Sequence, residues 1–218
     1  MEITYNPIYN GYLINVDEEK GHGCYTKILD KYISHFEDKL NKHNKVLQTR
    51  FDLRYPSDNS VTPQKEHLYN FHRNLIKDLS RNASLPGTEK KKNAFRKKNA
   101  VDPSLIKVVE QTDSDHPHVH CILLVNGNSK RTALDIFPRV ERQWANALGR
   151  EDAKGLVDYC TKSGPNPLMV SRSQTDFKSK MHNPSHQASY PAKIRDKDNN
   201  PKGSWSVSSS RISKTIKD

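Results

Sequence analysis

Apolar residues are scarce in this sequence. They make up 33% of its 218 residues, against roughly 45–50% in a typical globular domain, so we expect a modest core with long polar loops. No apolar run approaches the ~20 residues that a membrane-spanning helix needs. The first 20 residues also lack the basic-then-apolar order of a secretory leader. We therefore expect no contact with a membrane.

Cysteine is also rare. Cys24, Cys121 and Cys160 are odd in number and share no Cys-x-x-Cys spacing. Both observations argue against a framework of disulfides. Unpaired cysteines are typical of proteins in the reducing cytoplasm, which is the compartment we expect.

Positive charge, in contrast, is abundant and unevenly distributed. The net charge is +11, and residues 81–100 and 171–218 each carry +6, which leaves −1 for the remainder. Two basic segments of this kind predict a surface that binds nucleic acid. The alternative is that they only keep the chain in solution. The cations of the first segment that we expect to contact phosphates are Lys90, Lys91, Lys92, Arg96, Lys97 and Lys98.

The periodicity of apolar residues predicts the order of the elements. We expect an N-terminal arm over 1–24, a domain over 25–211 with a basic loop inserted at 81–104, and a tail over 212–218. Helices are predicted over 25–40, 63–79, 138–148 and, with a break near Pro184, 176–194. Strands are predicted over 46–55, 105–111, 117–125, 155–160, 168–170 and 204–208. This order predicts an α+β fold with a central, mostly antiparallel sheet flanked by helices.

Two histidines flank one apolar residue at the start of an aliphatic segment, as His118-Val119-His120. Strand residues two apart point to the same face, so the two imidazoles would lie side by side. Two imidazoles at that separation can bind one divalent cation. The alternative is a pair of ordinary strand histidines on a solvated face.

Glu110 precedes His118 by eight residues, on the partner strand of a predicted hairpin. It could share a sheet face with both histidines, and the alternative is an exposed strand residue. One carboxylate with two imidazoles leaves coordination positions open for a substrate. Zinc prefers a fourth protein ligand or sulfur. We therefore expect Mg²⁺ or Mn²⁺, polarising a phosphate.

Two Tyr-x-x-Lys sequences offer a nucleophile for such a phosphate, with Tyr159 followed by Lys162 and Tyr190 followed by Lys193. On a helix, residues i and i+3 share one face, so the lysine could neutralise charge near the phenolate. Gly155 and Gly164 leave too few residues for a helix around Tyr159. We therefore favour Tyr190 and Lys193 as catalytic residues, with Tyr159 and Lys162 as the alternative.

At this point the chain resembles a known family, the HUH endonucleases, and in particular the rolling-circle replication initiators of filamentous phages and related prophage elements. The resemblance covers about residues 25–211. It rests on four segments that occur in the family's order: Arg50-Phe51-Asp52-Leu53-Arg54-Tyr55-Pro56, Glu110 with His118–Asn126, Gln143–Gly149 with Gly155-Leu156-Val157, and Ala188–Lys193 with Ser208–Arg211.

The resemblance implies a sheet-and-helix domain of the HUH type. It also implies metal-dependent, sequence-specific nicking and joining of single-stranded DNA through a 5′-phosphotyrosine at Tyr190, with no second tyrosine beside it. Arg50 and Arg54 would contact DNA, and Tyr55 or Trp205 would be available for base stacking. The implied partners are single-stranded or hairpin origin DNA and host helicase and polymerase, in the cytoplasm of a bacterial host.

Some alternatives and one departure accompany this resemblance. A transposase or relaxase would use the same chemistry, whereas a DNA-binding regulator on the same scaffold would not be catalytic. The chain also has Pro191 where the family usually has an aliphatic residue. Proline inside a helix breaks it, so we expect the helix that carries Tyr190 to begin at that residue.

Overall fold

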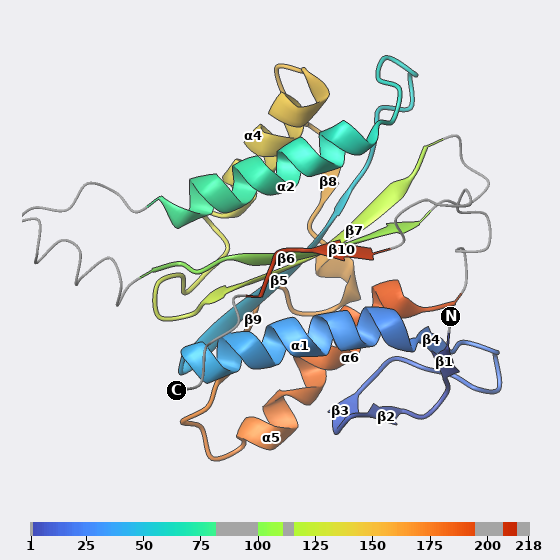
Figure 1. The fold of residues 1–218 in the computed structure, drawn as a ribbon, viewed down its shortest axis with the longest axis vertical. Coiled ribbons are helices and arrows are strands. Elements are labelled where there is room, and N and C mark those ends of the chain that lie inside the picture. Colours follow the sequence, from blue (N-terminus) through green and yellow to red (C-terminus); the bar gives the residue numbers. More distant parts are fainter. Residues whose placement is uncertain (1, 82–99, 111–115, 195–206, 213–218) are drawn as a thin grey trace, which may run out of the picture.

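The computed structural model describes residues 2–81, 100–110, 116–194 and 207–212, and its centre is an antiparallel sheet (Figure 1). The sheet has six strands. Five lie in the order β10 (Val207–Ser209), β6 (Ser104–Glu110), β7 (His118–Asn126), β5 (Lys45–Leu53) and β8 (Val157–Asp158), and β9 (Leu168–Ser171) also pairs with β5. Helices cover both faces. The predicted α+β class with a mostly antiparallel sheet is therefore confirmed.

Different helices cover the two faces of the sheet. Helices α2 (Lys65–Ser80) and α4 (Phe137–Leu148) pack on one face, and α1 (Thr26–Lys42) and α6 (His182–Ser189) pack on the other (Figure 1). Because both faces are covered, β5 and β7 are buried along almost their whole length instead of alternating between apolar and polar residues.

The central strand β7 divides its side chains between two cores. Val119, Cys121, Leu123 and Val125 join the core beneath α2 and α4, which surrounds the fully buried Trp144. Ile122 and Leu124 join the core beneath α1. His118 and His120 share the face of the second group, at the end of the strand where the apolar residues stop.

The helices begin and end close to the predicted positions, with one difference at α2. The predicted start at residue 63 is wrong, because Gln64 is extended (φ −134°, ψ 149°) and the helix begins only at Lys65. The predicted end of α4 at residue 148 is confirmed. Gly149 has φ +68°, a left-handed conformation that glycine adopts without steric cost.

The region after β8 is more broken than the pattern predicts. The strand stops at Asp158 because Cys160 has φ +54°, and a 3₁₀ turn (Thr161–Ser163) follows. Helix α5 (Phe177–Lys180) ends before Met181, and α6 begins at His182. The predicted break near Pro184 is therefore misplaced. Pro184 is the third residue of α6, where its missing N–H costs no helical hydrogen bond.

The N-terminal segment forms two small antiparallel pairs beside the start of α1 (Figure 1). Strand β1 (Ile3–Thr4) pairs with β4 (Cys24–Tyr25), and β2 (Ile8–Tyr9) pairs with β3 (Tyr12–Leu13). Tyr12, Ile14 and Cys24 are buried against α1 and the sheet. The segment is thus anchored to the domain, a feature that its lack of periodicity did not predict.

Candidate metal and tyrosine site

Three neighbouring strands bring the candidate ligands to one face of the sheet. In the register of β5 and β7, Asp52 lies opposite His120, and in the register of β6 and β7, Glu110 lies opposite His118. Directly opposed residues of an antiparallel pair point to the same face. A carboxylate therefore lies on each side of the histidine pair, Asp52 from β5 and Glu110 from β6. All four side chains are on the face covered by α1 and α6.

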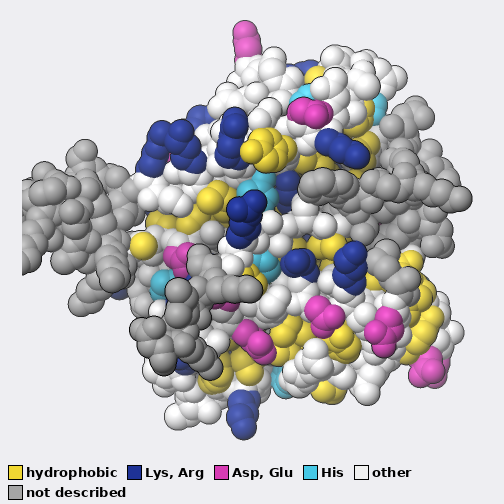
Figure 2. Space-filling model, viewed as in Figure 1, with side chains coloured by type: hydrophobic (Ala, Val, Ile, Leu, Met, Phe, Trp, Pro, Cys, Tyr) yellow, Lys and Arg dark blue, Asp and Glu magenta, His cyan; other side chains and the backbone are white. Residues whose placement is uncertain are grey.

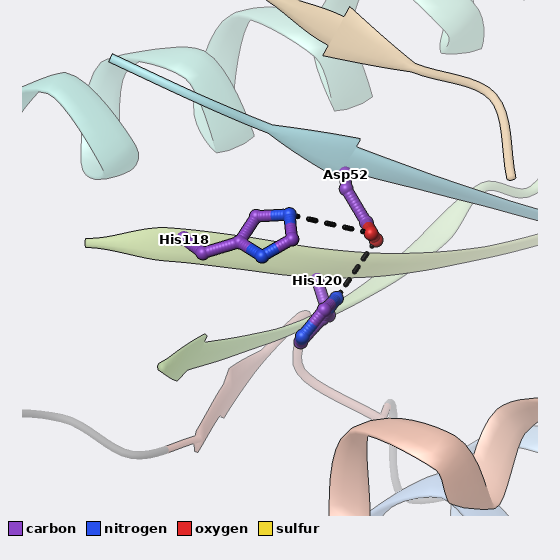
Figure 3. Close-up of side chains that lie close together, drawn as sticks. All are labelled: Asp52, His118 and His120. Carbon is purple, nitrogen blue, oxygen red and sulfur yellow. Dashed lines mark hydrogen bonds and ion pairs between the residues drawn. The ribbon is translucent and has the colours of Figure 1, made fainter. Parts of the chain in front are cut away.

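Asp52, His118 and His120 could together hold a metal ion (Figure 3). One ligand atom from each lies within 4.8 Å of the others. Asp52 Oδ1 is 2.9 Å from His120 Nδ1, and Asp52 Oδ2 is 3.3 Å from His118 Nε2. Asp52 and His120 are buried, whereas His118 is partly exposed. Solvent can therefore reach the cluster at His118, whereas Asp52 and His120 lie inside the protein.

Glu110 contacts the same cluster from the other side. Its Oε2 is 2.7 Å from His120 Nε2, so both ring nitrogens of His120 face a carboxylate. The structure therefore brings together the three residues that the sequence predicted, Glu110, His118 and His120, and adds Asp52. The sequence pointed to Asp52 only within the segment 50–56 that resembles the HUH family. The alternation of Arg50, Asp52 and Arg54 with apolar residues was the signal that could have identified it.

The electrostatics of the cluster favour positive charge. Burial opposes a charged His120, but the hydrogen bonds and charges of Asp52 and Glu110 outweigh it and raise the pKa of that imidazole. Burial likewise opposes a charged Asp52, but the adjacent imidazoles of His118 and His120 and the charge of Arg50 outweigh it and lower the pKa of the carboxyl group. A buried carboxylate with imidazole neighbours is a place where a cation is stabilised.

The donor set suits a divalent metal. It combines carboxylate oxygens with imidazole nitrogens, a mixture that binds first-row transition metals, and carboxylates also suit Mg²⁺ and Mn²⁺. His118 Nε2 is buried, and its contact with Asp52 does not meet hydrogen-bond geometry. A buried ring nitrogen in that state costs free energy, which coordination to a metal would recover.

Tyr190 lies directly beside this cluster. Its ring meets that of His120 edge to face, with centroids 5.8 Å apart and planes at 88°. The Arg50 guanidinium lies 4.4 Å from the centre of the Tyr190 ring, and Lys193 Nζ lies 5.7 Å from it. The structure thus gathers Tyr190, Lys193 and Arg50, from two distant parts of the sequence, around the histidines.

The backbone around Tyr190 differs from the expected helix start. Helix α6 ends at Ser189, and Tyr190–Ala192 form a 3₁₀ turn. Pro191 fits this turn because it lies at one of the first two positions, where no N–H donor is needed. Lys193 caps the turn, and so it comes back toward the ring of Tyr190.

The N-terminal segment contacts α6 and the end of the turn that contains Tyr190. The Asn15 N–H donates to Ser189 Oγ at 2.7 Å, and Ser185 Oγ donates to the Leu13 carbonyl at 2.8 Å. Cys24 forms a β-bridge with Lys193. These contacts lie on both sides of Tyr190 in the sequence, so the N-terminal segment fixes the position of the tyrosine relative to the sheet.

A pocket of about 250 Å³ adjoins Tyr190 and Arg50. Its polar lining includes Asn15 and, from α6, Asn183 and His186. Pro165 and Leu168 contribute apolar atoms. The pocket therefore offers space beside the tyrosine, with amide and imidazole groups facing it.

The alternative tyrosine lies elsewhere. Tyr159 stacks on Phe137 of α4, with ring centroids 4.0 Å apart, and its hydroxyl donates to Glu141 Oε1. Burial and then this carboxylate raise the pKa of Tyr159. Tyr159 packs against the core on the α4 side, the opposite face from the histidines, and Lys162 is exposed.

The residues predicted to bind DNA are not all at the site. Arg50 is 3% exposed and lies inside the site, whereas the exposed Arg54 lies 3.5 Å from Asp158 on β8. Tyr55 is buried and packs edge to face on Trp144, so it is not available for base stacking. Trp205 and the predicted loop cations lie outside the described residues, namely Lys90, Lys91, Lys92, Arg96, Lys97 and Lys98.

Comparison with known proteins identifies the family of this chain. No curated protein and no solved structure matches it. Among the described residues, no helix is long and apolar enough to cross a membrane. A family model described as the YagK/YfjJ C-terminal domain matches residues 8–204, from strand β2 through the tyrosine turn. Because this match covers most of the sequence, the chain belongs to the YagK/YfjJ C-terminal domain family.

Proposed function

We propose that this chain is a metal-dependent enzyme that nicks and rejoins single-stranded DNA through a tyrosine. In this proposal it starts rolling-circle replication of a phage or mobile element, at a specific origin sequence and with host helicase and polymerase. One observation carries the proposal. The ring of Tyr190 contacts His120, in a cluster whose other members, Asp52 and His118, could hold a metal ion.

The charges around Tyr190 support phosphoryl transfer. A divalent metal bound by Asp52, His118 and His120 would polarise the scissile phosphate as a Lewis acid. Arg50 and Lys193 place two positive charges beside the tyrosine. Negative charge develops on the phosphate oxygens as the nucleophile attacks, and fixed cations in a site that excludes water stabilise it.

The covalent step is balanced within the site and solvent. Tyr190 Oη forms a bond to phosphorus while the bond from phosphorus to the 3′ oxygen breaks. The phenol releases one proton to water, and the 3′ oxygen takes one proton from water and becomes the free hydroxyl that polymerase extends. Rejoining is the same step in reverse. The pocket beside Tyr190 has space for part of the nucleotide that carries the scissile phosphate.

Detection of the covalent adduct tests this proposal. The protein is incubated with Mn²⁺ and a pool of single-stranded oligonucleotides of random sequence that carry a label at the 3′ end. The label must be at this end because the fragment with the 5′ phosphate stays on the tyrosine. We expect a labelled band that survives denaturation, and mass spectrometry of the digested protein should place the nucleotide on Tyr190.

Two controls define the outcome. Tyr190→Phe removes the nucleophile while keeping the ring, and it should abolish the band, as should EDTA. A wild-type protein that binds the same DNA but gives no adduct under any metal would contradict the enzyme. It would instead support the alternative of a non-catalytic DNA-binding regulator on the same scaffold.

A further inference from the structure

Helix α2 has an unusual exposed side. Its apolar residues, among them Phe71, Leu75 and Leu79, are buried in the core against the sheet and α4. On the solvent side, Tyr69 is 63% exposed, and Arg73 and Lys77 are exposed as well. Among the described residues, Tyr69 is the most exposed aromatic side chain, and it lies beside cations of the same helix.

The exposed residues form a regular line. Tyr69, Arg73, Lys77 and the exposed Arg81, which caps the helix, follow one another at intervals of four residues. Residues four apart lie on the same side of a helix and about 6 Å apart along its axis. Each step of four residues also turns about 40° around the axis, so Tyr69, Arg73 and Lys77 lie within about 80° of one another on the outer side of α2. Arg81 follows them at the extended cap of the helix.

The charge along this line is not balanced by acids. Within α2, Glu66 is exposed, but Asp78 is already paired with Arg139 and Arg142 of α4, at 3.0 and 2.7 Å. Asp78 therefore does not neutralise Arg73 or Lys77. Dark-blue side chains accordingly gather over α2 in the upper part of Figure 2.

Helix α1, on the other face of the sheet, is an internal comparison. Its solvent side alternates Lys27, Lys31 and Lys42 with three acids, Asp30, Glu37 and Asp38. Magenta side chains accompany the dark-blue ones in this lower part of Figure 2. Both helices are amphipathic, so the excess of cations on α2 is not a general consequence of having a solvated side.

Tyr69 and Arg73 also interact with each other. The Arg73 guanidinium lies 5.5 Å from the centre of the Tyr69 ring. An aromatic ring and a guanidinium plane are the two groups on which unpaired bases stack, and cations along the same line would follow the phosphates. A double-stranded nucleic acid would not use the Tyr69 ring, because its base faces are stacked inside the duplex. An acidic protein would be attracted by the cations alone, so it gives the ring no role.

We propose that the line Tyr69–Arg73–Lys77–Arg81 binds a single-stranded nucleic acid. Tyr69 and Arg73 stack on bases, and Lys77 and Arg81 contact the backbone. This surface is separate from the metal and tyrosine site, because α2 covers the opposite face of the sheet. It does not depend on nicking activity and it would equally serve a protein that only binds nucleic acid.

The test measures the salt dependence of binding to oligothymidylate by fluorescence anisotropy, in EDTA so that no metal contributes. The variant Arg73→Gln/Lys77→Gln/Arg81→Gln removes three cations. The slope of log K against log salt should become shallower by about 1.4, because the phosphate contacts of Lys77 and Arg81 are lost at about 0.7 each on a single strand. Tyr69→Ala should weaken binding at least about fivefold while leaving the slope unchanged, because it removes stacking only.

A matched control removes the same charge elsewhere. Lys27→Gln/Arg172→Gln/Lys178→Gln neutralises three exposed cations outside α2, and its slope should change by clearly less than that of the α2 variant. Equal slopes in the two variants would overturn the proposal. So would an α2 variant that loses binding to duplex DNA or to phosphatidylserine vesicles but keeps binding to oligothymidylate. Circular dichroism confirms that each variant is folded before it is compared.

Discussion

The ring of Tyr190 stands edge to face on the ring of His120, with the two planes at 88° and the centroids 5.8 Å apart. The two residues belong to different parts of the fold, since His120 is in the central strand β7 and Tyr190 follows α6. Tyr159 shares the Tyr-x-x-Lys pattern but lies on the opposite face of the sheet. Geometry therefore separates the two candidate tyrosines that the sequence left open.

Phenylalanine variants distinguish the two tyrosines directly. Tyr190→Phe should lose the covalent DNA adduct, because it removes only the hydroxyl and keeps the contacts of the ring with His120 and Arg50. Tyr159→Phe should keep the adduct and lose only the hydrogen bond to Glu141. Both are measured as the fraction of DNA label that stays with the denatured protein. The reverse pattern would move the nucleophile to Tyr159.

The two carboxylates of the cluster should differ in their importance for the metal. Asp52 is close to both imidazoles, so Asp52→Asn is expected to weaken Mn²⁺ binding by at least the roughly 10- to 100-fold that loss of an outer partner costs. Glu110→Gln should weaken it less. Calorimetric titration with Mn²⁺ measures both.

A third carboxylate serves as the control for this titration. Asp158 lies opposite Asp52 in the sheet but is half exposed and contacts Arg54. Asp158→Asn should therefore leave Mn²⁺ affinity close to that of the unchanged protein. If Glu110→Gln proves more damaging than Asp52→Asn, the metal lies on the Glu110 side of His120 instead.

The two histidines should contribute differently to stability in the absence of metal. His120 is 2% exposed, and its removal would take one close ion pair each from the Asp52 and Glu110 carboxylates inside the protein. His120→Ala is therefore expected to lower the free energy of unfolding by about 3 kcal/mol. His118 is partly exposed, and His118→Ala should cost less than about 1 kcal/mol. Urea unfolding in EDTA at neutral pH gives both values, and equal losses would contradict the difference in burial.

We expect the fold to be sensitive to acid because of two other histidines, the buried His35 and the partly buried His72. Burial lowers the pKa of His35 and of His72 to about 4 in each case, with nearby lysines adding to the effect. The unfolded chain binds protons at a pKa near 6.5, so it takes up more protons than the folded chain between about pH 6.5 and pH 4. Stability should therefore fall as the pH is lowered through this window, by up to about 3 kcal/mol for each histidine.

The pH dependence can be assigned by substitution. The variant His35→Gln/His72→Gln should show a shallower loss of stability between pH 6.5 and pH 4, whatever its stability at pH 7. The comparison uses slopes because each substitution also removes a hydrogen bond, to Ser104 from His35 and to Ser210 from His72. His22→Gln, in the N-terminal segment, is the control, and its slope should match that of the unchanged protein.

Arg50 should contribute to the rate of adduct formation but not to the affinity for the metal. Its guanidinium lies over Tyr190 and also 3.6 Å from Asp52. Arg50→Gln should slow adduct formation by about 10²-fold, as the loss of one fixed donor to a charged transition state does. Removing this positive charge should not weaken Mn²⁺ binding. Arg54→Gln, an exposed neighbour, should have little effect on the rate, and a loss of Mn²⁺ affinity in Arg50→Gln would contradict the assigned role.

Local patterns in the sequence predicted the central hairpin well. The aliphatic run after His120 and the regular apolar spacing of α1 and α4 identify these elements because their burial repeats at short intervals. Glu110 could be placed beside the histidines for the same reason, since a hairpin joins neighbouring strands. Its pairing opposite His118 then follows from the register.

The remaining features depend on contacts between distant segments. Asp52 becomes a ligand candidate only because β5 pairs with β7 in one register, and no local pattern specifies that register. The short strands of residues 1–24 have no period because each contains only two residues. The turn at Tyr190–Ala192 depends on packing of Ala192 against Cys24 and Ile14, which lie at the other end of the sequence.

The two parts of the site are held in place by different segments of the chain. Asp52, Glu110 and both histidines are carried by the three central strands, so this half persists as long as the sheet is intact. Tyr190 is held by contacts from Leu13, Asn15 and Cys24. Removal of residues 1–24 should therefore leave the metal ligands in place but no longer hold Tyr190 beside them. The first residues of the sequence thus control the position of a residue near its other end.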